Sequence, residues 1–101
     1  MRYAKKKKIV VTNTPDAPTE AVIELNLGLI FMLIRNISIH NDEIKKSIWV
    51  RKFGLRLQFL KIGILGLGRV GIGLSEKLLK IGASKIFYND LCTIHTQQKE
   101  F

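Results

Sequence analysis

Cysteine, proline and acidic residues are all scarce in this chain of 101 residues. The single cysteine, Cys92, excludes an internal disulfide and fits a reducing compartment, so we expect a cytoplasmic protein. The two prolines, Pro15 and Pro18, stand on either side of Asp16, which predicts a turn or linker at this point. No apolar segment directly follows the basic residues at the start, so no signal peptide is expected.

The shortage of acids, 8 against 17 Lys and Arg, leaves a net charge of +9. Lys5–Lys8 form one basic run, and a second cluster interleaves Trp49 and Phe53 with Lys45, Lys46, Arg51, Lys52 and Arg56. Basic residues beside aromatics can contact nucleic acid, and a lysine run can hold an anionic membrane surface. We favour two solvated faces, because neither cluster comes with a recognisable nucleic-acid-binding motif. The two aromatics are expected to anchor an irregular arm onto the core.

A long apolar run is also missing. Only ten residues separate Glu24 from Arg35, and Asn26 is one of them, whereas a bilayer span needs roughly 20 apolar residues. We therefore expect no membrane span. Apolar residues nevertheless occur on all sides of a helix predicted at 19–35. This pattern indicates a helix that is buried on most sides, as a domain-crossing helix or a subunit interface.

Shorter elements are predicted around that helix. The β-branched Ile9–Val11 favours a strand. Asp16 or Thr19 is expected to cap the start of the helix at 19–35. A second helix is predicted at 38–47, with acids early and lysines late, as the helix dipole prefers.

The most specific pattern is the G-x-G-x-x-G turn Gly66-Leu67-Gly68-Arg69-Val70-Gly71. Its context has the order of a dinucleotide-binding unit: an apolar strand at 60–65, a helix with apolar residues at Val70, Leu74, Leu78 and Ile81, a C-capping Gly82, a strand at 85–88, and Asp90. Asp90 lies 19 residues after Gly71. The sequence therefore predicts a βαβ unit.

Each residue of this turn has a physical role in binding a dinucleotide. Gly66 permits a tight turn, Gly68 lets the backbone approach a pyrophosphate, and Gly71 lets the helix pack close to the strand. The helix then presents its free N–H groups to the phosphates. Asp90 can accept hydrogen bonds from the ribose, and its charge favours NAD over NADP. The alternative is a glycine-rich βα turn with no ligand.

A longer stretch resembles a known family. The segment Val11-Thr12-Asn13-Thr14-Pro15-Asp16-Ala17-Pro18-Thr19-Glu20-Ala21-Val22, followed by Glu24-Leu25, Gly28-Leu29, Trp49 and Gly63–Gly71, is similar to the D-isomer-specific 2-hydroxyacid dehydrogenases. The D-3-phosphoglycerate dehydrogenase branch looks closest. The resemblance covers residues 3–91, and its two motifs together are more specific than either alone.

The resemblance implies an α/β fold: a partial Rossmann, NAD-binding domain whose βαβ unit is preceded by a domain-crossing helix. Residues 1–15 would be the last strand of a substrate domain, 16–91 the crossing helix and the first part of the NAD domain, and 92–101 an unstructured tail. The backbone of Arg69 and Val70 would meet the pyrophosphate, and Asp90 would bind the ribose. The crossing helix would contribute to a homodimer.

The same resemblance implies hydride transfer between C2 of a D-2-hydroxyacid and nicotinamide, with a histidine–glutamate pair for the hydroxyl proton and an arginine for the carboxylate. These three residues lie beyond the matching stretch, and neither His40 nor His95 matches the histidine. Phe59 also replaces a usual turn glycine. We therefore expect a fragment that retains part of the NAD site without catalytic residues. The alternatives are a non-catalytic dimerisation or binding module and a basic nucleic-acid-binding protein.

Overall fold

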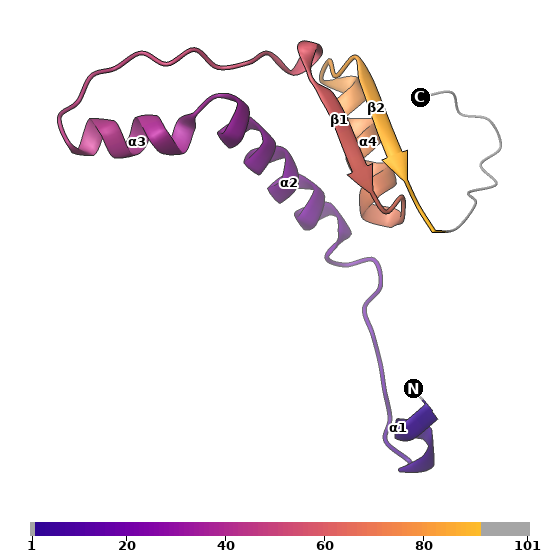
Figure 1. The fold of residues 1–101 in the computed structure, drawn as a ribbon. Coiled ribbons are helices and arrows are strands. Elements are labelled where there is room, and N and C mark those ends of the chain that lie inside the picture. The colour runs from indigo at the N-terminus through magenta and orange to yellow at the C-terminus, as the bar shows by residue number, and fades with distance from the viewer. Residues whose placement is uncertain (1, 92–101) are drawn as a thin grey trace.

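The structure is a computed structural model that describes residues 2–91 (Figure 1). Its elements are, in order, α1 (Arg2–Lys6), α2 (Thr19–Ile34), α3 (Ile37–Lys45), the 3-10 turn η1 (Leu57–Phe59), β1 (Lys61–Leu65), α4 (Arg69–Lys80) and β2 (Lys85–Asn89). The predicted helices at 19–35 and 38–47 and the predicted βαβ unit are confirmed to within two residues at each end. The predicted tail at 92–101, with Cys92 and His95, lies outside the described residues.

The βαβ unit is the ordered centre of the chain. β1 and β2 pair in parallel, in a register that places Lys61 opposite Lys85 and Leu65 opposite Asn89. Parallel neighbours need a crossover connection, and α4 provides it while covering one face of the pair (Figure 1). The left-handed Gly82, with φ of +103°, ends the connection after α4, as the predicted C-cap required.

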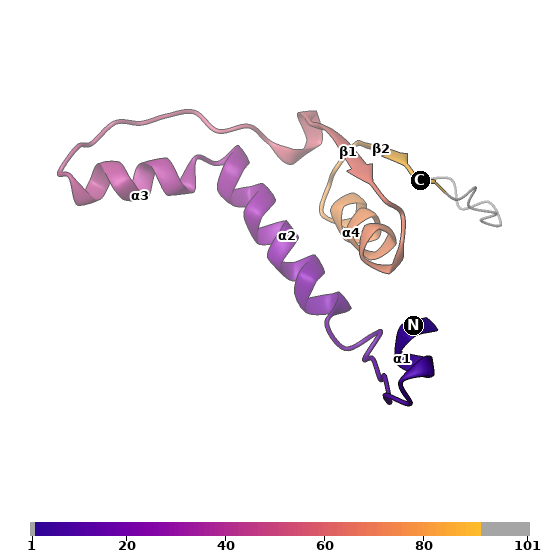
Figure 2. The same cartoon turned by 60° about the horizontal axis from the view of Figure 1, so that its bottom comes forward.

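A small hydrophobic core forms where α4 lies between the strands and α2 (Figure 2). Its buried members are Ile23, Leu57, Ile64, Leu67, Leu74, Leu78 and Ala83. Leu78 and Ile23 are 0% and 1% exposed, so burial of each contributes about 1.5–3 kcal/mol. The end of the Ile23 side chain packs directly on the backbone of Gly73, where an added Cβ would lie 2.5 Å from Ile23 Cδ1. Ile23, together with the partly buried Leu27, Ile30 and Ile34, therefore packs α2 against this core.

Within residues 2–91, α2 is not buried on most sides, so the described part of the chain does not bury it as predicted. The alternative, that a second subunit covers this helix, stays a prediction. Ile23 is the one buried residue of α2, and large apolar side chains on its other sides are exposed: Val22, Leu25, Leu29, Phe31 and Leu33. The physical reason is that α4 covers one side of α2, and no other element among residues 2–91 packs along the opposite side (Figure 2). The helix therefore has the composition of a buried element, but most of its surface is exposed.

The predicted side-chain cap of α2 is also wrong. Thr19 is already the first helical residue, and no side chain caps the helix. The backbone carbonyl of Asp16 instead accepts a hydrogen bond from the Thr19 N–H at 3.2 Å. The Asp16 carboxylate lies 3.3 Å from the guanidinium Nε of Arg69 on α4, and this ion pair occupies the group that was expected to cap.

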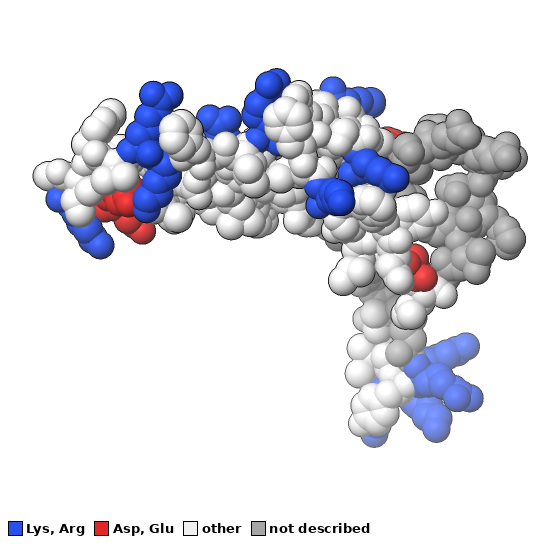
Figure 3. All heavy atoms as spheres, turned by 45° about the horizontal axis from the view of Figure 1, so that its top comes forward, with Lys and Arg blue, Asp and Glu red and all other residues white. Residues whose placement is uncertain are grey.

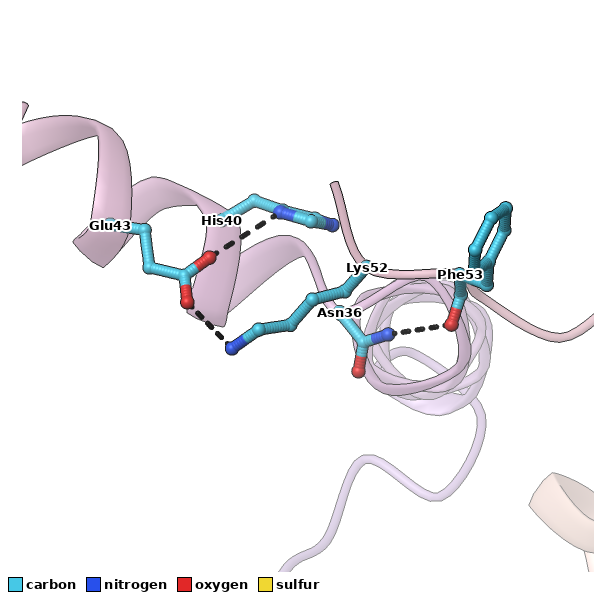
Figure 4. A network of polar contacts seen from close by, with 5 residues as sticks. All are labelled: Asn36, His40, Glu43, Lys52 and Phe53. Atoms are coloured by element: carbon cyan, nitrogen blue, oxygen red, sulfur yellow. Dashed lines mark hydrogen bonds and ion pairs between the residues drawn. The ribbon is translucent and has the colours of Figure 1, made fainter. Parts of the chain in front are cut away.

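Residues 48–56 form an extended arm that returns from α3 to β1 (Figure 1). The prediction that Trp49 and Phe53 anchor this arm is wrong, because their side chains are 89% and 88% exposed. Polar contacts attach the arm instead (Figure 4). Lys52 Nζ lies 2.6 Å from Glu43 on α3, and the Asn36 side chain donates to the Phe53 carbonyl at 3.2 Å.

The strand predicted at Ile9–Val11 does not form. A strand needs a neighbour to satisfy its backbone hydrogen bonds, and no strand lies beside this segment in residues 2–91. The preceding α1 ends through the left-handed Lys8, with φ of +55°, and the Ile9 N–H donates to the Ala4 carbonyl. The apolar side chains of Ile9–Val11 are exposed.

Within residues 2–91, no single helix has both the length and the apolar character for crossing a membrane. One bent pair, α2 with α3 at 63°, reaches that length and composition together.

Candidate functional site

The turn between β1 and α4 has the backbone geometry that its glycines permit. Gly66 has a φ of +93°, a conformation that side chains rarely tolerate. At Gly71 an added Cβ would overlap the backbone carbonyl of Gly66, so α4 can lie this close to the turn only without a side chain there. Around Gly68, by contrast, a Cβ would meet nothing within 4 Å. Two of the three glycines thus shape the turn, while the third faces open space.

α4 begins at this open space. Gly68 is the N-cap residue, with extended backbone, and no side chain caps the helix. The first intrahelical bond comes from the Ile72 N–H to the Gly68 carbonyl, at 2.9 Å. The N–H groups of the first turn, from Arg69 to Gly71, therefore have no partner within the helix, and they carry the positive end of its dipole. This end of α4 is suited to an anion.

Asp90 lies directly beside the glycine turn. β2 carries it there, because the Gly66 N–H bonds to the carbonyl of the neighbouring Asn89 at 2.8 Å. The partly buried carboxylate of Asp90 accepts a hydrogen bond from the Leu67 N–H at 2.6 Å. The acid predicted from a spacing of 19 residues is thus brought into contact with the turn, and it also holds the turn in shape.

A pocket of about 470 Å³ opens between the glycine turn and the segment that precedes α2. Its lining consists of Pro15, Pro18, Thr19, Val22, Gly66, Gly68, Arg69, Val70 and Gly71. All the predicted cofactor residues except Asp90 are in this lining, and Asp90 reaches the turn through Leu67. The sequence had placed Pro15–Thr19 only in a linker and a cap, so its share in the pocket was missed.

The Arg69 side chain joins the two walls of this pocket. Its guanidinium donates to the Pro15 carbonyl at 3.1 Å and forms the ion pair with Asp16. A second link lies farther along the same two helices, where Lys77 Nζ donates to Glu20 Oε2 at 2.5 Å. This hydrogen bond raises the pKa of Lys77 above its ordinary value of 10.5. These contacts join residues 54 and 57 apart in sequence, so no local pattern could have revealed them.

The remaining sequence candidates lie away from the turn. His40 is on α3, where its Nδ1 lies 3.8 Å from Glu43 Oε2, in the network that also holds Lys52 (Figure 4). Among residues 2–91 no group of three or more His, Cys, Asp or Glu side chains could hold a metal ion. Both basic clusters are exposed, and basic side chains gather on α1 and near α3 and the arm (Figure 3).

Comparison with known proteins shows the family to which the chain is related. The family model described as "D-isomer specific 2-hydroxyacid dehydrogenase, NAD binding domain" matches residues 27–101. The chain belongs to this family. The α/β fold and the partial Rossmann domain predicted from the sequence are thereby confirmed.

Relatives within this dehydrogenase family include D-3-phosphoglycerate dehydrogenases. That of Methanocaldococcus jannaschii is 35% identical over 88 residues, which cover 85% of this chain and 17% of the relative. The human enzyme is 34% identical over 93 residues, which cover 90% of this chain and 17% of the relative. The chain thus spans about a sixth of the length of these curated relatives.

Solved structures of the family share the fold. The TT0316 protein of Thermus thermophilus superposes with a TM-score of 0.83 at 27% identity, over 95% of this chain and 32% of that one. The D-lactate dehydrogenase of Aquifex aeolicus, solved with NAD and lactic acid, superposes with a TM-score of 0.78 at 28% identity, over 93% of this chain and 29% of that one.

Proposed function

We propose that residues 60–90 bind the adenosine and pyrophosphate part of NAD, as part of an NAD-dependent D-2-hydroxyacid dehydrogenase. The observation that supports this most directly is the open space at Gly68, which faces a pocket at the uncapped start of α4. A turn that served only to connect β1 and α4 would have no need of a glycine there, since the φ of Gly68 is an ordinary −77°.

Different residues of the site would contact different parts of the cofactor. The first-turn N–H groups of Arg69 and Val70 would meet the pyrophosphate, which the bare backbone of Gly68 allows to come close. Asp90, whose carboxylate is fixed by the Leu67 N–H, would accept hydrogen bonds from the adenosine ribose. Its negative charge would repel the 2′-phosphate of NADP. Bound NAD would supply the hydride acceptor of the reaction.

We propose that this chain binds cofactor without completing hydride transfer. His40, the one histidine of residues 2–91, contacts Glu43 on α3, away from the β1–α4 turn (Figure 1). No catalytic residue is therefore assigned within the described part. We also propose that residues 1–15 belong to a substrate domain, and that the substrate of the complete enzyme is a D-2-hydroxyacid or the corresponding 2-oxoacid, as the names of the relatives suggest.

The open side of α2 supports a further proposal, a homodimer. Leu25 and Leu33 on this helix are 62% and 73% exposed, and the arm adds the exposed Trp49 and Phe53. An apolar surface of this extent is typical of an interface. Light scattering should show a mass above that of the monomer, which falls when Leu25 and Leu33 are both replaced by Lys. A wild type that stays a stable monomer would contradict this proposal.

Ligand-observed NMR tests the cofactor site with NAD, ADP-ribose and NADP. We expect weak binding, on the order of millimolar, with NAD and ADP-ribose equal, because these residues contact only the adenosine side. Gly68→Val should abolish binding, since its side chain would fill the space for the phosphate. Gly63→Val is the matched control: Gly63 also has nothing within 4 Å of an added Cβ, but it lies in β1 outside the pocket.

Asp90→Asn tests the ribose contact. Asparagine keeps an oxygen that can accept the Leu67 N–H and removes only the charge, so the turn should persist while the preference for NAD over NADP narrows. Equal binding of NAD and NADP by the wild type would argue against the role of Asp90. Unchanged binding by Gly68→Val would mean that the glycine turn is only a connection.

A further inference from the structure

The strongest unexplained feature of the pocket is a carboxylate next to a site for an anion. Asp16 is not needed to cap α2, and its side chain is 80% exposed, yet Oδ1 lies 3.3 Å from Arg69 Nε. Among the described residues that line the pocket, Arg69 is the only one with a charged side chain. Asp16 thus neutralises the single side-chain cation that the pocket offers to a phosphate.

A backbone carbonyl holds the Arg69 guanidinium in the same place as the Asp16 carboxylate does. The Arg69 guanidinium also donates to the carbonyl of Pro15 at 3.1 Å, so both groups that hold it come from one turn of the chain. Pro15 and Pro18 belong to the wall of the pocket that faces Gly68. A phosphate that took over Arg69 would therefore remove the contacts that attach this wall to α4.

Building on the proposed NAD site, we propose that Asp16 is an electrostatic gate on the phosphate pocket. In the free chain the Asp16 carboxylate occupies Arg69, and a bound pyrophosphate replaces it there and releases the segment 9–18. Because such coupling is reciprocal, cofactor binding loosens this segment and attachment of the segment weakens cofactor binding. Asp16 acts through Arg69 and is a positioning residue.

The release is confined to the segment before α2. Ile23 remains buried against Gly73, and Glu20 remains bonded to Lys77, so the helix itself stays on α4. The free residues are those between α1 and Thr19, which form no helix or strand. The gate therefore couples the cofactor to the orientation of residues 1–15, the part that we assign to a substrate domain.

Binding of ADP-ribose to four variants, measured by calorimetry or NMR titration, tests the gate. Asp16→Asn should bind about 1.4- to fivefold more tightly than the wild type, the range expected from an exposed ion pair of about 0.2–1 kcal/mol. Glu20→Gln is the matched control: it removes the same charge near the same end of α2 and breaks an ion pair to α4, but its partner Lys77 does not line the pocket, whereas Arg69 does. Its affinity should equal that of the wild type.

Arg69→Gln and the double variant Asp16→Asn/Arg69→Gln complete a cycle. Arg69→Gln should bind more weakly, and adding Asp16→Asn to it should change nothing, because the carboxylate then has no cation to withhold. The advantage of Asp16→Asn should also shrink in about 1 M salt. Equal effects of Asp16→Asn and Glu20→Gln would overturn the gate while leaving the NAD site intact. A failure of every variant to bind ADP-ribose would overturn the NAD site and the gate together.

Amide hydrogen exchange at Thr19 reports on the segment before α2 directly, which an affinity measurement does not. The Thr19 N–H bonds to the carbonyl of Asp16, in the same turn whose Pro15 carbonyl and Asp16 carboxylate hold Arg69, so its exchange reports whether that turn keeps its shape. In the free proteins this amide should exchange faster in Asp16→Asn and in Arg69→Gln than in the wild type. ADP-ribose should speed exchange in the wild type alone. Slower or unchanged exchange on binding would refute the release of the segment.

Discussion

Gly71→Ala separates the glycine that shapes the turn from the glycine that admits the ligand. The added methyl at Gly71 would overlap the carbonyl oxygen of Gly66, and it would lie 3.2 Å from the Gly66 carbonyl carbon and 3.5 Å from Ile64 Cγ2. The obstructing atom is backbone and cannot rotate away. Relief of the overlap requires the start of α4 to move away from β1, which disturbs the contacts of Ile64 and Leu74 in the core.

The size of the effect follows from two opposing contributions. Overpacking of this kind costs about 1–3 kcal/mol, and a backbone obstruction belongs at the upper end of that range. Alanine recovers at most about 1 kcal/mol of helix propensity relative to glycine. The net loss is about 2 kcal/mol, which corresponds to a fall in Tm of about 10 °C in a domain of this size.

Urea and thermal unfolding followed by circular dichroism measure this loss. Gly68→Ala is the control, because a Cβ there meets nothing within 4 Å and the φ is ordinary. It should lose only the weak capping preference of glycine, less than about 1 kcal/mol, while ADP-ribose binding falls. A Gly71→Ala protein that unfolds at the same urea concentration as the wild type would refute the close approach of α4 to the turn.

Three further predictions concern packing, pH and activity. Ile23→Ala should destabilise the monomer by about 2–5 kcal/mol, whereas Leu25→Ala should change the stability of the monomer by less than about 0.5 kcal/mol; chemical unfolding of dilute protein compares the two. Because Glu20 raises the pKa of Lys77 above 10.5, the pairing of these two side chains should stabilise the fold below pH 10.5 and lose this effect as the pH rises through the folded pKa of Lys77. The unfolding midpoints of Glu20→Gln and the wild type should therefore converge at high pH. The isolated chain should not oxidise D-3-phosphoglycerate or another 2-hydroxyacid at saturating NAD, and turnover that co-purifies with it would contradict the proposed absence of catalytic residues.

The βαβ unit was predictable because its signals are local. Helical spacing correctly predicted that Leu74 and Leu78 lie on the buried face of α4, although Ile81 of the same pattern follows the helix and is 48% exposed. The positive φ of Gly66 and Gly82 was predictable because glycine, which has no Cβ, adopts it readily. The spacing of Asp90 was also informative, since a parallel pair of strands with one helix between them returns the chain to the same edge of the sheet.

Burial and exposure could not be read in the same way. The sequence of α2 has the composition of a core helix, and Trp49 and Phe53 are residues of a type that often anchors a segment. Whether these side chains are buried nevertheless depends on which other parts of the chain pack against them. A side chain is buried only when another element covers it, and the local sequence does not predict which element that will be. The same holds for Ile9–Val11, whose β-branched residues have no strand beside them in the described part of the chain.

The sequence by itself therefore determined the βαβ unit, its glycine turn and the acid that follows it, because backbone freedom and hydrophobic period act over a few residues. Only the tertiary structure decided which distant groups meet. The Arg69 contacts with Pro15 and Asp16, the packing of Gly73 on Ile23, and the bond from Leu67 to Asp90 all join separate elements. Their geometry is set by how α2 and β2 pack against α4 and β1, and the Asp16 gate follows from that packing.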